Sequence, residues 1–473
     1  MGFVRGEDRQ QSSLFPLALD ELVPADHVCR VIEAFVARLP LLQLGFAKAA
    51  PKATGRPAYD PGDLLKLYLY GYLHQLRSSR RLERECQRNV EAMWLLNRLA
   101  PDHKTIAQFR REHGDAIKRA GAWFVRFCQG AGVVRGEWVA IDGSKFQAVA
   151  SAKAVLHRKA LMEEQSRIEA RIAAYLVELE AGDAATADEP PTDPQAVARA
   201  LEALRERKTL VEELTEAVCA DGHTHLVVSE PDARRMKGHG PGYNVQSAVD
   251  GAHGVIVAHE VHAEASDNRS LQPMAEAARD ALGVDRLDVL ADAGYSNGAQ
   301  AAALEAQNIL PHVPAHRGVN NQGDGTQFDR TAFAYDPDND RFTCPTGRPL
   351  ERKQLDRKEK MVIYAAEPAH CGACALKARC TQSRQRHVTR HLHEEALQRM
   401  HARATPEAMR KRRCTVEHPF GALKYQIFEK PRFLLRGLRG ARTEMAIATL
   451  VWNMKRALRV LGEANLIRQL APA

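Results

Sequence analysis

The stretch that decides the fold reads EWVAIDG and spans residues 137–143. Its apolar, β-branched residues predict a buried strand, and Asp142-Gly143 at its end is a turn signal. The arrangement recurs in RLDVLADAGYSN, residues 286–297, where an apolar run ends at Asp292. Carboxylates that follow strands of an α/β sheet gather at one edge, the usual place for an active site. Asp142 and Asp292 are therefore candidate catalytic residues, although a strand-end aspartate is also a common turn former.

Further strands and helices follow in alternation. Residues 242–262 predict a β-hairpin joined by DGAHG, residues 271–282 a helix, and residues 298–307 a second helix that leads into the strand NILP. This order predicts a mixed α/β sheet.

The first ~130 residues predict short helices separated by polar turns. The last of them begins at Asp102, which can cap it, and carries Arg110 and Arg111 on its expected surface. Short helices that end in a basic one fit a helix-turn-helix-like DNA reader, in which these two arginines contact phosphates or form a solvated face. The aromatic residues of this region are expected in its core, namely Tyr68, Tyr70, Tyr72 and Phe109.

Two long charged helical stretches begin at His157 and Asp193. They predict a helical hairpin with solvated coiled-coil flanks, inserted into the α/β domain. Between them, GDAATADEPPTD at residues 182–193 is too acidic and proline-rich to pack.

The charge of the chain points to a polyanionic partner. Lys and Arg outnumber Asp and Glu by 67 to 59, for a net charge of +8, and residues 403–442 hold 11 basic against 3 acidic residues. Such a concentration favours DNA binding. No apolar run reaches the ~18 residues of a membrane helix, and the start lacks a secretory h-region, so we expect a cytoplasmic, nucleoid-associated protein.

Nine cysteines without a secretory signal predict reduced thiols. The scattered ones are expected to be buried as small hydrophobes, namely Cys29, Cys86, Cys128, Cys219 and Cys414. The other four cluster in Cys371-x2-Cys374-x5-Cys380 with Cys344 in CPTG, and could supply four thiolates to a structural Zn²⁺. His370 competes as a ligand, and free thiols are the alternative.

Glu417 is a single acid in the basic stretch KRRCTVEHPFGALK, residues 411–424. Three carboxylates would repel one another unless hard cations lay between them, and two Mg²⁺ ions about 4 Å apart can hold both oxygens of a phosphoryl displacement. On a helix Arg413, Glu417 and Lys424 fall within about 40° of one another. Pro419 predicts a kink or restart of that helix. A stray acid paired with Arg413 is the alternative.

In these motifs the chain resembles the DDE transposases of bacterial insertion sequences. The resemblance rests on VAIDGSKFQA (139–148), DVLADAGYSN (288–297) and RCTVEHPFGALK (413–424), and on the helical region 78–110. The group's signature is Tyr-x2-Arg-x3-Glu-x6-Lys. Arg413, Glu417 and Lys424 match it, while Arg410 takes the tyrosine position.

The resemblance implies an RNase H-like catalytic core in which Asp142, Asp292 and Glu417 bind two divalent ions, Mg²⁺ with Mn²⁺ as an alternative. One site would cleave DNA at the element's ends and then join the freed 3′-OH to target DNA. Arg413 and Lys424 would hold phosphates, with Lys145 a weaker candidate. Double-stranded DNA, as terminal inverted repeats and target, and a homodimer or larger assembly are the implied partners.

The expected organisation is an α/β protein of four parts. They are a helical DNA-binding domain (1–132), an RNase H-like core (133–314 and 390–460), a helical hairpin within it (155–220) and a small Cys-rich β insertion (315–389). Three other functions remain open: a DNA-binding regulator with an inert core, an RNase H-type nuclease without strand transfer, and a degenerate transposase without cleavage activity.

Overall fold

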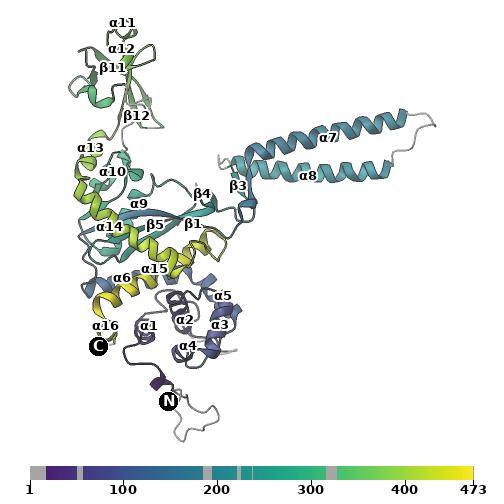
Figure 1. The fold of residues 1–473 in the computed structure, drawn as a ribbon, viewed down its shortest axis with the longest axis vertical. Coiled ribbons are helices and arrows are strands. Elements are labelled where there is room, and N and C mark those ends of the chain that lie inside the picture. The colour runs from purple at the N-terminus through teal and green to yellow at the C-terminus, as the bar shows by residue number, and fades with distance from the viewer. Residues whose placement is uncertain are drawn as a thin grey trace, which may run out of the picture.

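The computed structural model describes residues 18–50, 57–184, 194–220, 225–236, 238–315, 327–358 and 360–471, and at their centre lies a six-stranded mixed sheet (Figure 1). Its strands are β1 (Trp138–Gln147), β4 (Arg234–Met236), β5 (Gly240–Asp250), β6 (Ile256–His262), β7 (Leu287–Leu290) and β8 (Ile309–His312). β5 pairs antiparallel with β1, β4 and β6, whereas β1, β7 and β8 run parallel. The expected mixed α/β class, with the 242–262 hairpin, is confirmed.

β1 is longer than its sequence predicts. Val139, Ala140 and Ile141, directly before Asp142, are fully buried, as expected. The strand then continues through Asp142-Gly143 to Gln147, because β5 pairs with it residue for residue as far as Gly242. The predicted turn at Asp142-Gly143 is therefore wrong: a continuous ladder outweighs the local turn preference. Asp142 consequently stands on a paired strand, which fixes its position.

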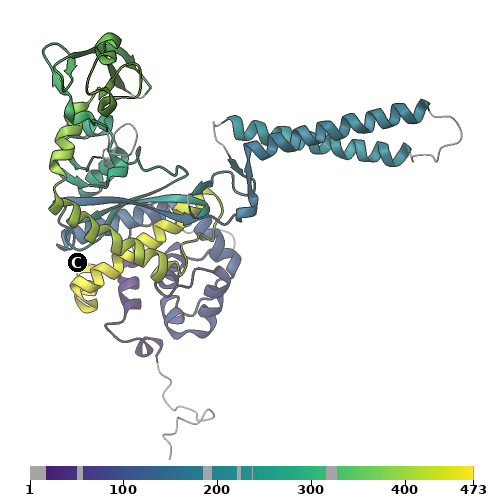
Figure 2. The same ribbon diagram turned by 45° about the horizontal axis from the view of Figure 1, so that its top comes forward.

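Helices cover both faces of the sheet (Figures 1 and 2). α9 (Leu271–Leu282) and α10 (Gly298–Glu305) lie on one face, and α14 (Pro406–Ala422) and α15 (Gly437–Leu461) on the other. α6 (Gly114–Gly130) packs along α15. α14 does not restart at Pro419 as expected; it continues to Ala422, where the π-helical turn η5 (Leu423–Ile427) begins.

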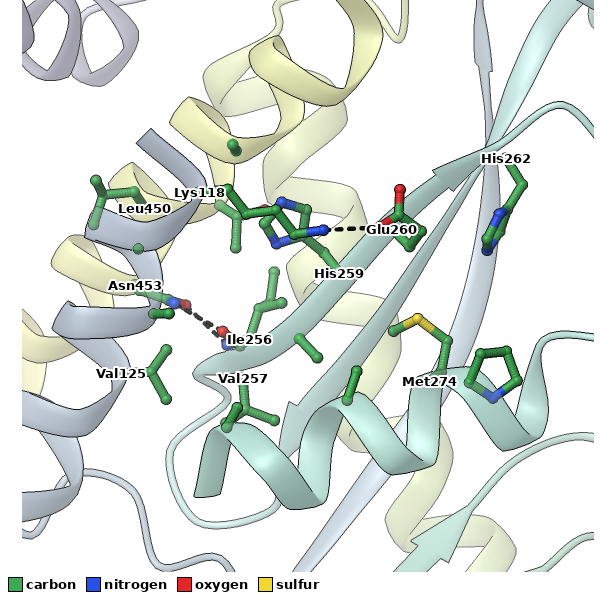
Figure 3. A pocket seen from close by; sticks show the side chains of 18 residues that line it. Lys118, Val125, Ile256, Val257, His259, Glu260, His262, Met274, Leu450 and Asn453 are labelled. Carbon is green, nitrogen blue, oxygen red and sulfur yellow. Dashed lines mark hydrogen bonds and ion pairs between the residues drawn. The ribbon is translucent and has the colours of Figure 1, made fainter. Parts of the chain in front are cut away.

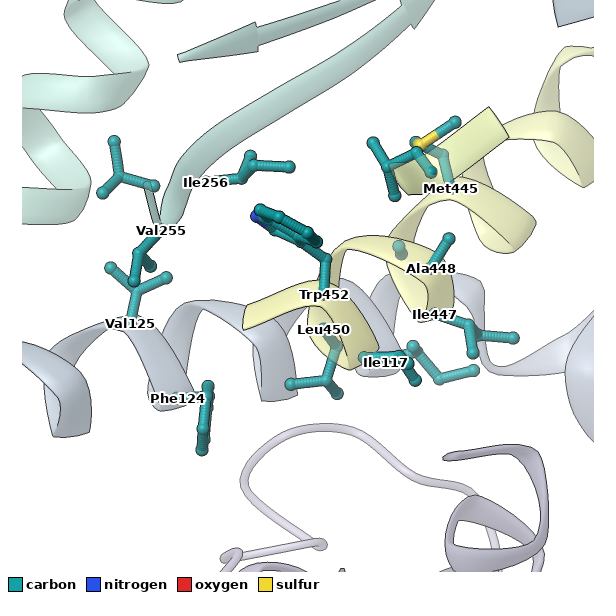
Figure 4. Packing of buried hydrophobic residues seen from close by; sticks show 14 of the residues in the cluster. Ile117, Phe124, Val125, Val255, Ile256, Met445, Ile447, Ala448, Leu450 and Trp452 are labelled. Atoms are coloured by element: carbon teal, nitrogen blue, oxygen red, sulfur yellow. The ribbon is translucent and has the colours of Figure 1, made fainter. Parts of the chain in front are cut away.

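The main core joins α15 and α6 to the edge strand β6 (Figure 4). Trp452 packs there and donates its indole N–H to the carbonyl of Gly254 (2.9 Å). The amide of the neighbouring Asn453 bonds both backbone groups of Ile256 (2.8 Å each). A buried amide thus satisfies the outer backbone groups of a strand end that would otherwise be unpaired.

The N-terminal region is helical. It comprises η1 (Leu19–Leu22), α1 (Val28–Ala37), α2 (Pro61–Leu73), α3 (Ser79–Arg88), α4 (Val90–Leu95) and α5 (His103–Glu112). Asp102 caps α5 by accepting from the N–H groups of Lys104 (2.8 Å) and Thr105 (3.0 Å). The aromatic core prediction holds, since the four residues named above are all buried.

Arg110 differs from the prediction that it stands on the surface. Its side chain is buried, donates to the carbonyl of Arg77 (3.0 Å) and lies over the ring of Tyr68. The guanidinium therefore makes its contacts within the helical region and is not accessible to DNA. The neighbouring Arg111 is exposed.

Two 27-residue helices, α7 (Arg158–Ala184) and α8 (Pro194–Ala220), project from the sheet side by side (Figures 1 and 2). At their base β2 (Val155–His157) pairs with β3 (His225–Val227). Their seam is a small apolar cluster of Leu161, Ile168, Val211 and Val218. Most of the acidic segment predicted between them lies outside the described residues.

The Cys-rich region forms a second, five-stranded sheet of order β13-β12-β11-β10-β9. Its elements are η4 (Arg330–Ala332), β9 (Ala334–Asp336), β10 (Arg341–Thr343), β11 (Pro349–Asp356), β12 (Met361–Ala366), α11 (Pro368–Gly372), α12 (Lys377–Cys380) and β13 (His387–His391). It has its own small core around Phe342 and Tyr364. α13 (Glu394–Arg403) follows it and packs on α10, and α16 (Glu463–Leu470) packs on α1.

The nine cysteines are free thiols. Cys29, Cys86 and Cys128 are buried as expected, but Cys219 and Cys414 are exposed, so the burial prediction is wrong for these two. Both lie on outer faces of α8 and α14, whose apolar stripe is too narrow to cover them. Among the described helices, none is long and apolar enough to span a bilayer.

Candidate active site

Asp142 and Asp292 occupy equivalent positions relative to neighbouring parallel strands, which brings them together. β1 and β7 are parallel, and Ala140 opposite Leu290 is their last pair. Each aspartate follows that pair by two residues, so the two stand beside each other at the carboxyl end of β7. The structure thus places the two predicted acids at one edge of the sheet, where ligands of α/β folds bind.

A single guanidinium joins the two carboxylates. Arg412 Nη2 lies 2.7 Å from Oδ1 of Asp142 and 3.3 Å from Oδ2 of Asp292. Arg412 belongs to α14, which packs on β1 and β7, and its side chain is only 12% exposed. Two acids that share one buried cation form a site that attracts positive charge.

The two aspartates differ in their surroundings. Burial, together with the nearby carboxylates of Asp292 and Asp267, raises the pKa of Asp142 to about 6 against the opposing effects of Arg412 and the Gly143 N–H. Asp292 is more open and caps the 3₁₀ helix η3 (Ala293–Tyr295) by accepting from the Gly294 N–H (2.8 Å). A cation bound between them would favour the charged form of Asp142.

Asp267 is a nearby carboxylate that the sequence reasoning missed. Its Oδ1 accepts from the side-chain amides of Asn244 and Gln246 (2.7 Å each) and from Lys145 Nζ (3.3 Å). A Cβ at Gly143 would lie 2.3 Å from Gln246 Nε2 and 2.7 Å from that oxygen, so only glycine allows this approach. The signal available in the sequence was the pair of amides, Asn244 and Gln246, on the predicted strand that begins at residue 242. The structure buries both side chains completely, at 0% exposed.

The Asp267 network reaches the turn that holds Asp292. Tyr295, fully buried in η3, donates its hydroxyl to Oε1 of Gln246 (2.5 Å). Burial raises the pKa of Tyr295, so it remains a neutral donor. A continuous hydrogen-bonded path therefore links η3 to β5 and to the loop before α9, which holds the backbone around both aspartates.

Lys424 packs on the strand that carries Asp142. It is the second residue of the π-helical η5, and its ammonium lies 5.8 Å from the centre of the ring of Phe146, which follows Asp142 by four residues on β1. Burial lowers the pKa of Lys424, whereas the charge of Asp142 opposes that shift, which shows the two groups within electrostatic range. π-helical turns inside helices are frequent at functional sites.

Glu417 and Arg413 are not paired with the aspartates. Both side chains are exposed, and within the described residues neither makes an ion pair or side-chain hydrogen bond. The face of α14 that meets the sheet is that of Arg412 and Val416, which are four residues apart. The structure therefore joins Asp142, Asp292 and Arg412, places Lys424 over the same strand as Asp142, and leaves the third predicted acid, Glu417, exposed.

The other predicted contacts are distributed differently. Lys145 is paired with Asp267, with its Nζ 3.3 Å from Oδ1. Three of the predicted zinc ligands, Cys344, Cys371 and Cys380, pack against the small core of the Cys-rich region. Over the part of the chain that the structure describes, no group of three or more His, Cys, Asp or Glu side chains is arranged to hold a metal ion.

A hollow separate from the aspartates lies beside β6 (Figure 3). It has a volume of about 270 Å³ between α6, α9 and α15 and is mostly apolar. At its rim Glu260 is held by Lys118 (2.8 Å) and Arg442 (2.7 Å), and these cations outweigh burial and hold the pKa of Glu260 at about 2. This ion-pair group fastens two helices to the edge strand.

His259, in the same hollow, gives the protein a pH-dependent stability. Burial, with Lys118 nearby, lowers the pKa of His259 to about 4. The unfolded chain therefore binds a proton at His259 from about pH 6.5 downward, whereas the folded chain does not, so stability falls as the pH falls from 6.5 towards 4. Between pH 7.5 and pH 5, the free energy of unfolding of His259→Gln should fall by less than that of the parent, as measured by chemical unfolding. Equal falls in the two proteins would contradict this.

Comparison with known proteins identifies the family of the chain. The family described as Transposase DDE domain matches residues 212–454, just over half of the chain, and the Transposase domain (DUF772) matches residues 17–112. The DDE match includes Asp292 and Glu417, and Asp142 precedes it. No curated protein was found to match.

Among solved structures, the piggyBac transposase synaptic complex with hairpin DNA aligns over 94% of this chain and 78% of its own, at 8% identity and a TM-score of 0.31. That score is too low to establish a shared fold. The extent of the DDE match decides the assignment: the chain belongs to the DDE transposases of insertion sequences.

Proposed function

We propose that Asp142, Asp292 and Glu417 hold the divalent ions of this transposase, two Mg²⁺ with Mn²⁺ as the alternative. The observation that carries the proposal is the shared cation: Asp142 and Asp292 already hold one positive group, Arg412, between them. Carboxylate oxygens are the ligands that Mg²⁺ prefers, so the donor set fits. Members of the family depend on divalent metal.

Glu417 is the third proposed metal ligand because it lies on α14, the helix that contacts both aspartates. The helix that touches both aspartates through Arg412 bears Glu417 five residues later. Its exposed carboxylate is free to turn, and metal binding requires both its approach and the withdrawal of Arg412, since one position cannot hold two cations. The strand order β6-β5-β1-β7-β8, with three antiparallel strands followed by two parallel ones, supports an RNase H-like core.

The other side chains orient the DNA. Bound divalent ions would activate the attacking oxygen and stabilise charge on the scissile phosphate. Lys424, fixed over Phe146 beside Asp142, would bind a phosphate oxygen next to the reacting one. Exposed Arg413 and Arg111 would contact the backbone further out. The DNA is the element's terminal repeats and then the target, and pairing of two ends requires at least a dimer.

Strand cleavage of labelled DNA that carries the element's ends tests this function. The native protein should nick the DNA at the element's boundary in Mg²⁺ and not in EDTA, and should then join the 3′-OH to a second DNA. DNA binding without cleavage in either Mg²⁺ or Mn²⁺ would instead support the regulator or the degenerate transposase. Cleavage without joining would support the nuclease.

We also propose that the four clustered cysteines bind a structural Zn²⁺. Cys344, Cys371 and Cys380 pack against the same small core. Burial raises the pKa of Cys380, the charge of Arg386 opposes that shift, and the other three thiols of the cluster add to it. Four thiolates around a small sheet are typical of structural zinc, which stabilises regions with little core of their own.

Metal analysis tests the zinc site. We expect one zinc per chain in the purified protein and its loss in Cys374→Ser. Cys414→Ser is the matched control, since this exposed cysteine lies on α14, outside the Cys-rich region, and should retain the metal. Protein free of zinc after purification without chelators would exclude the site.

A further inference from the structure

A polar cleft opens between the sheet domain and the Cys-rich region. It has a volume of about 960 Å³. One wall is formed by the starts of α9 and α10, and the other by β12, β13 and α13. Small-molecule sites of this size are mostly apolar with few polar groups. This lining is mostly polar or charged, so a small apolar ligand is a poor match.

The cleft carries an excess of positive charge. Arg269 on one wall and Lys358 and Lys360 on the other are exposed, and within the described residues none of their side chains is paired with an acid. The acid of the cleft, Glu394, is already held by Arg330 (2.8 Å) and by a backbone N–H. Three unpaired cations facing one hollow suit a ligand with several negative charges.

The cleft is lined by residues that follow Asp267 and Asp292 closely in the chain. Asn268, one residue after Asp267, and Ser296, four residues after Asp292, both line it. Asn297 donates to the carbonyl and side-chain oxygens of Asn268 (3.3 Å each), which ties the starts of α9 and α10 together. This wall is therefore rigid and continuous with the site.

The far wall is fixed as well. Ser296 Oγ lies 3.0 Å from Nε2 of His401 on α13. A Cβ at Gly298 would lie 2.6 Å from His391 Nδ1, so glycine at the start of α10 lets β13 approach closely. The Cys-rich sheet is thus held against the core at a defined distance, and its β11–β12 turn presents Lys358 and Lys360 to the cleft.

We propose that this cleft holds the phosphate backbone of the DNA that runs past the active site, with Arg269, Lys358 and Lys360 as its phosphate contacts. The inference rests on the proposed active site and assigns a role to the Cys-rich region, namely to close one side of the DNA path. Flanking DNA and target DNA offer the same phosphates, so the test separates them.

The test is the salt dependence of DNA affinity. Arg269→Ala/Lys358→Ala/Lys360→Ala is compared with a control that removes the same charge from the helical hairpin, Arg158→Ala/Arg171→Ala/Arg205→Ala, all exposed. Each lost phosphate contact lowers the slope of log K against log salt by about 0.9. The cleft variant should lose about 2 to 3 from the slope, and the hairpin variant should match the parent.

Two DNAs identify the strand. One is a duplex that carries an uncut element end with its flank; the other pairs a pre-cleaved end with a random target duplex. If the cleft variant has a reduced slope on the first DNA, the cleft binds flanking DNA. If it has a reduced slope on the second DNA, the cleft binds target DNA. Either result supports the proposal. Slopes equal to those of the hairpin control on both DNAs would overturn the proposal.

The same samples separate this proposal from the active-site proposal. If the salt dependence of DNA binding is steeper for the native protein than for the cleft variant, but the native protein does not cleave in Mg²⁺, the cleft proposal stands and the metal-site proposal fails. If it cleaves and the cleft variant keeps the native slope, the metal site stands and the cleft fails. Unchanged thermal unfolding of both triple variants shows that the exposed substitutions leave the fold intact.

Discussion

Replacement of Glu444 by alanine is expected to destabilise the protein by about 3 to 5 kcal/mol. Glu444 is fully buried on α15, where its Oε1 accepts from the backbone N–H groups of Leu434 (2.7 Å) and Leu435 (2.6 Å). Its Oε2 accepts from Arg77 Nη1 (3.2 Å) and the Tyr72 hydroxyl (3.3 Å). Alanine would leave two backbone N–H groups without their acceptor and the buried guanidinium of Arg77 without its carboxylate, with only the carbonyl of Arg432 left to accept from Nη1 (3.1 Å).

Urea unfolding measures this loss. Glu444→Gln keeps an acceptor for the backbone and removes only the charge, so it should fall between the native protein and the alanine variant. Glu463→Ala, on the exposed first turn of α16, is the control and should change stability by less than about 0.5 kcal/mol. A loss below about 1 kcal/mol in Glu444→Ala would show that the helical region does not depend on this acid.

Replacement of Asp142 by asparagine should lower cleavage by about 10³-fold, which corresponds to about 4 kcal/mol of lost charge stabilisation in the transition state. The same change should raise the stability of the metal-free protein at pH 7. Since the pKa of Asp142 is raised to about 6, the folded state disfavours its charge at that pH. Asparagine removes the cost, which is about 1 to 3 kcal/mol.

Paired measurements of cleavage rate and urea unfolding separate this result from general damage. Asp288→Asn is the matched control, because Asp288 lies on β7 four residues before Asp292, and it should leave cleavage unchanged. A variant Asp142→Asn that cleaves normally, or that is less stable than the native protein, would contradict the role given to this residue.

The sheet and the pairing of its two aspartates could be predicted because both depend on local pattern. Apolar runs such as the one before Asp292 specify buried strands, and parallel neighbours place the residues after them at one edge. The helix 271–282 was predicted with its observed bounds because its apolar period is regular and Gly283 ends it in the left-handed region.

The rest depends on contacts between distant segments. Arg412 could not be separated from Arg413 by composition; only the packing of Val416 shows which face of α14 meets the sheet. Asp267 joins the site through amides of β5, more than 20 residues before it. Arg110 is buried by α2 and by the carbonyl of Arg77, which local sequence does not reveal.

The most direct test of the account compares Glu417→Gln with Glu407→Gln in the Mg²⁺-dependent cleavage assay. Both acids are exposed on α14, and Glu407 is paired with Lys411 (3.0 Å), so the two variants remove the same charge from the same helix. If Glu417 completes the metal site, its variant binds DNA but does not cleave it, while Glu407→Gln cleaves normally. Normal cleavage by Glu417→Gln would contradict the account and leave Glu417 as an ordinary surface charge.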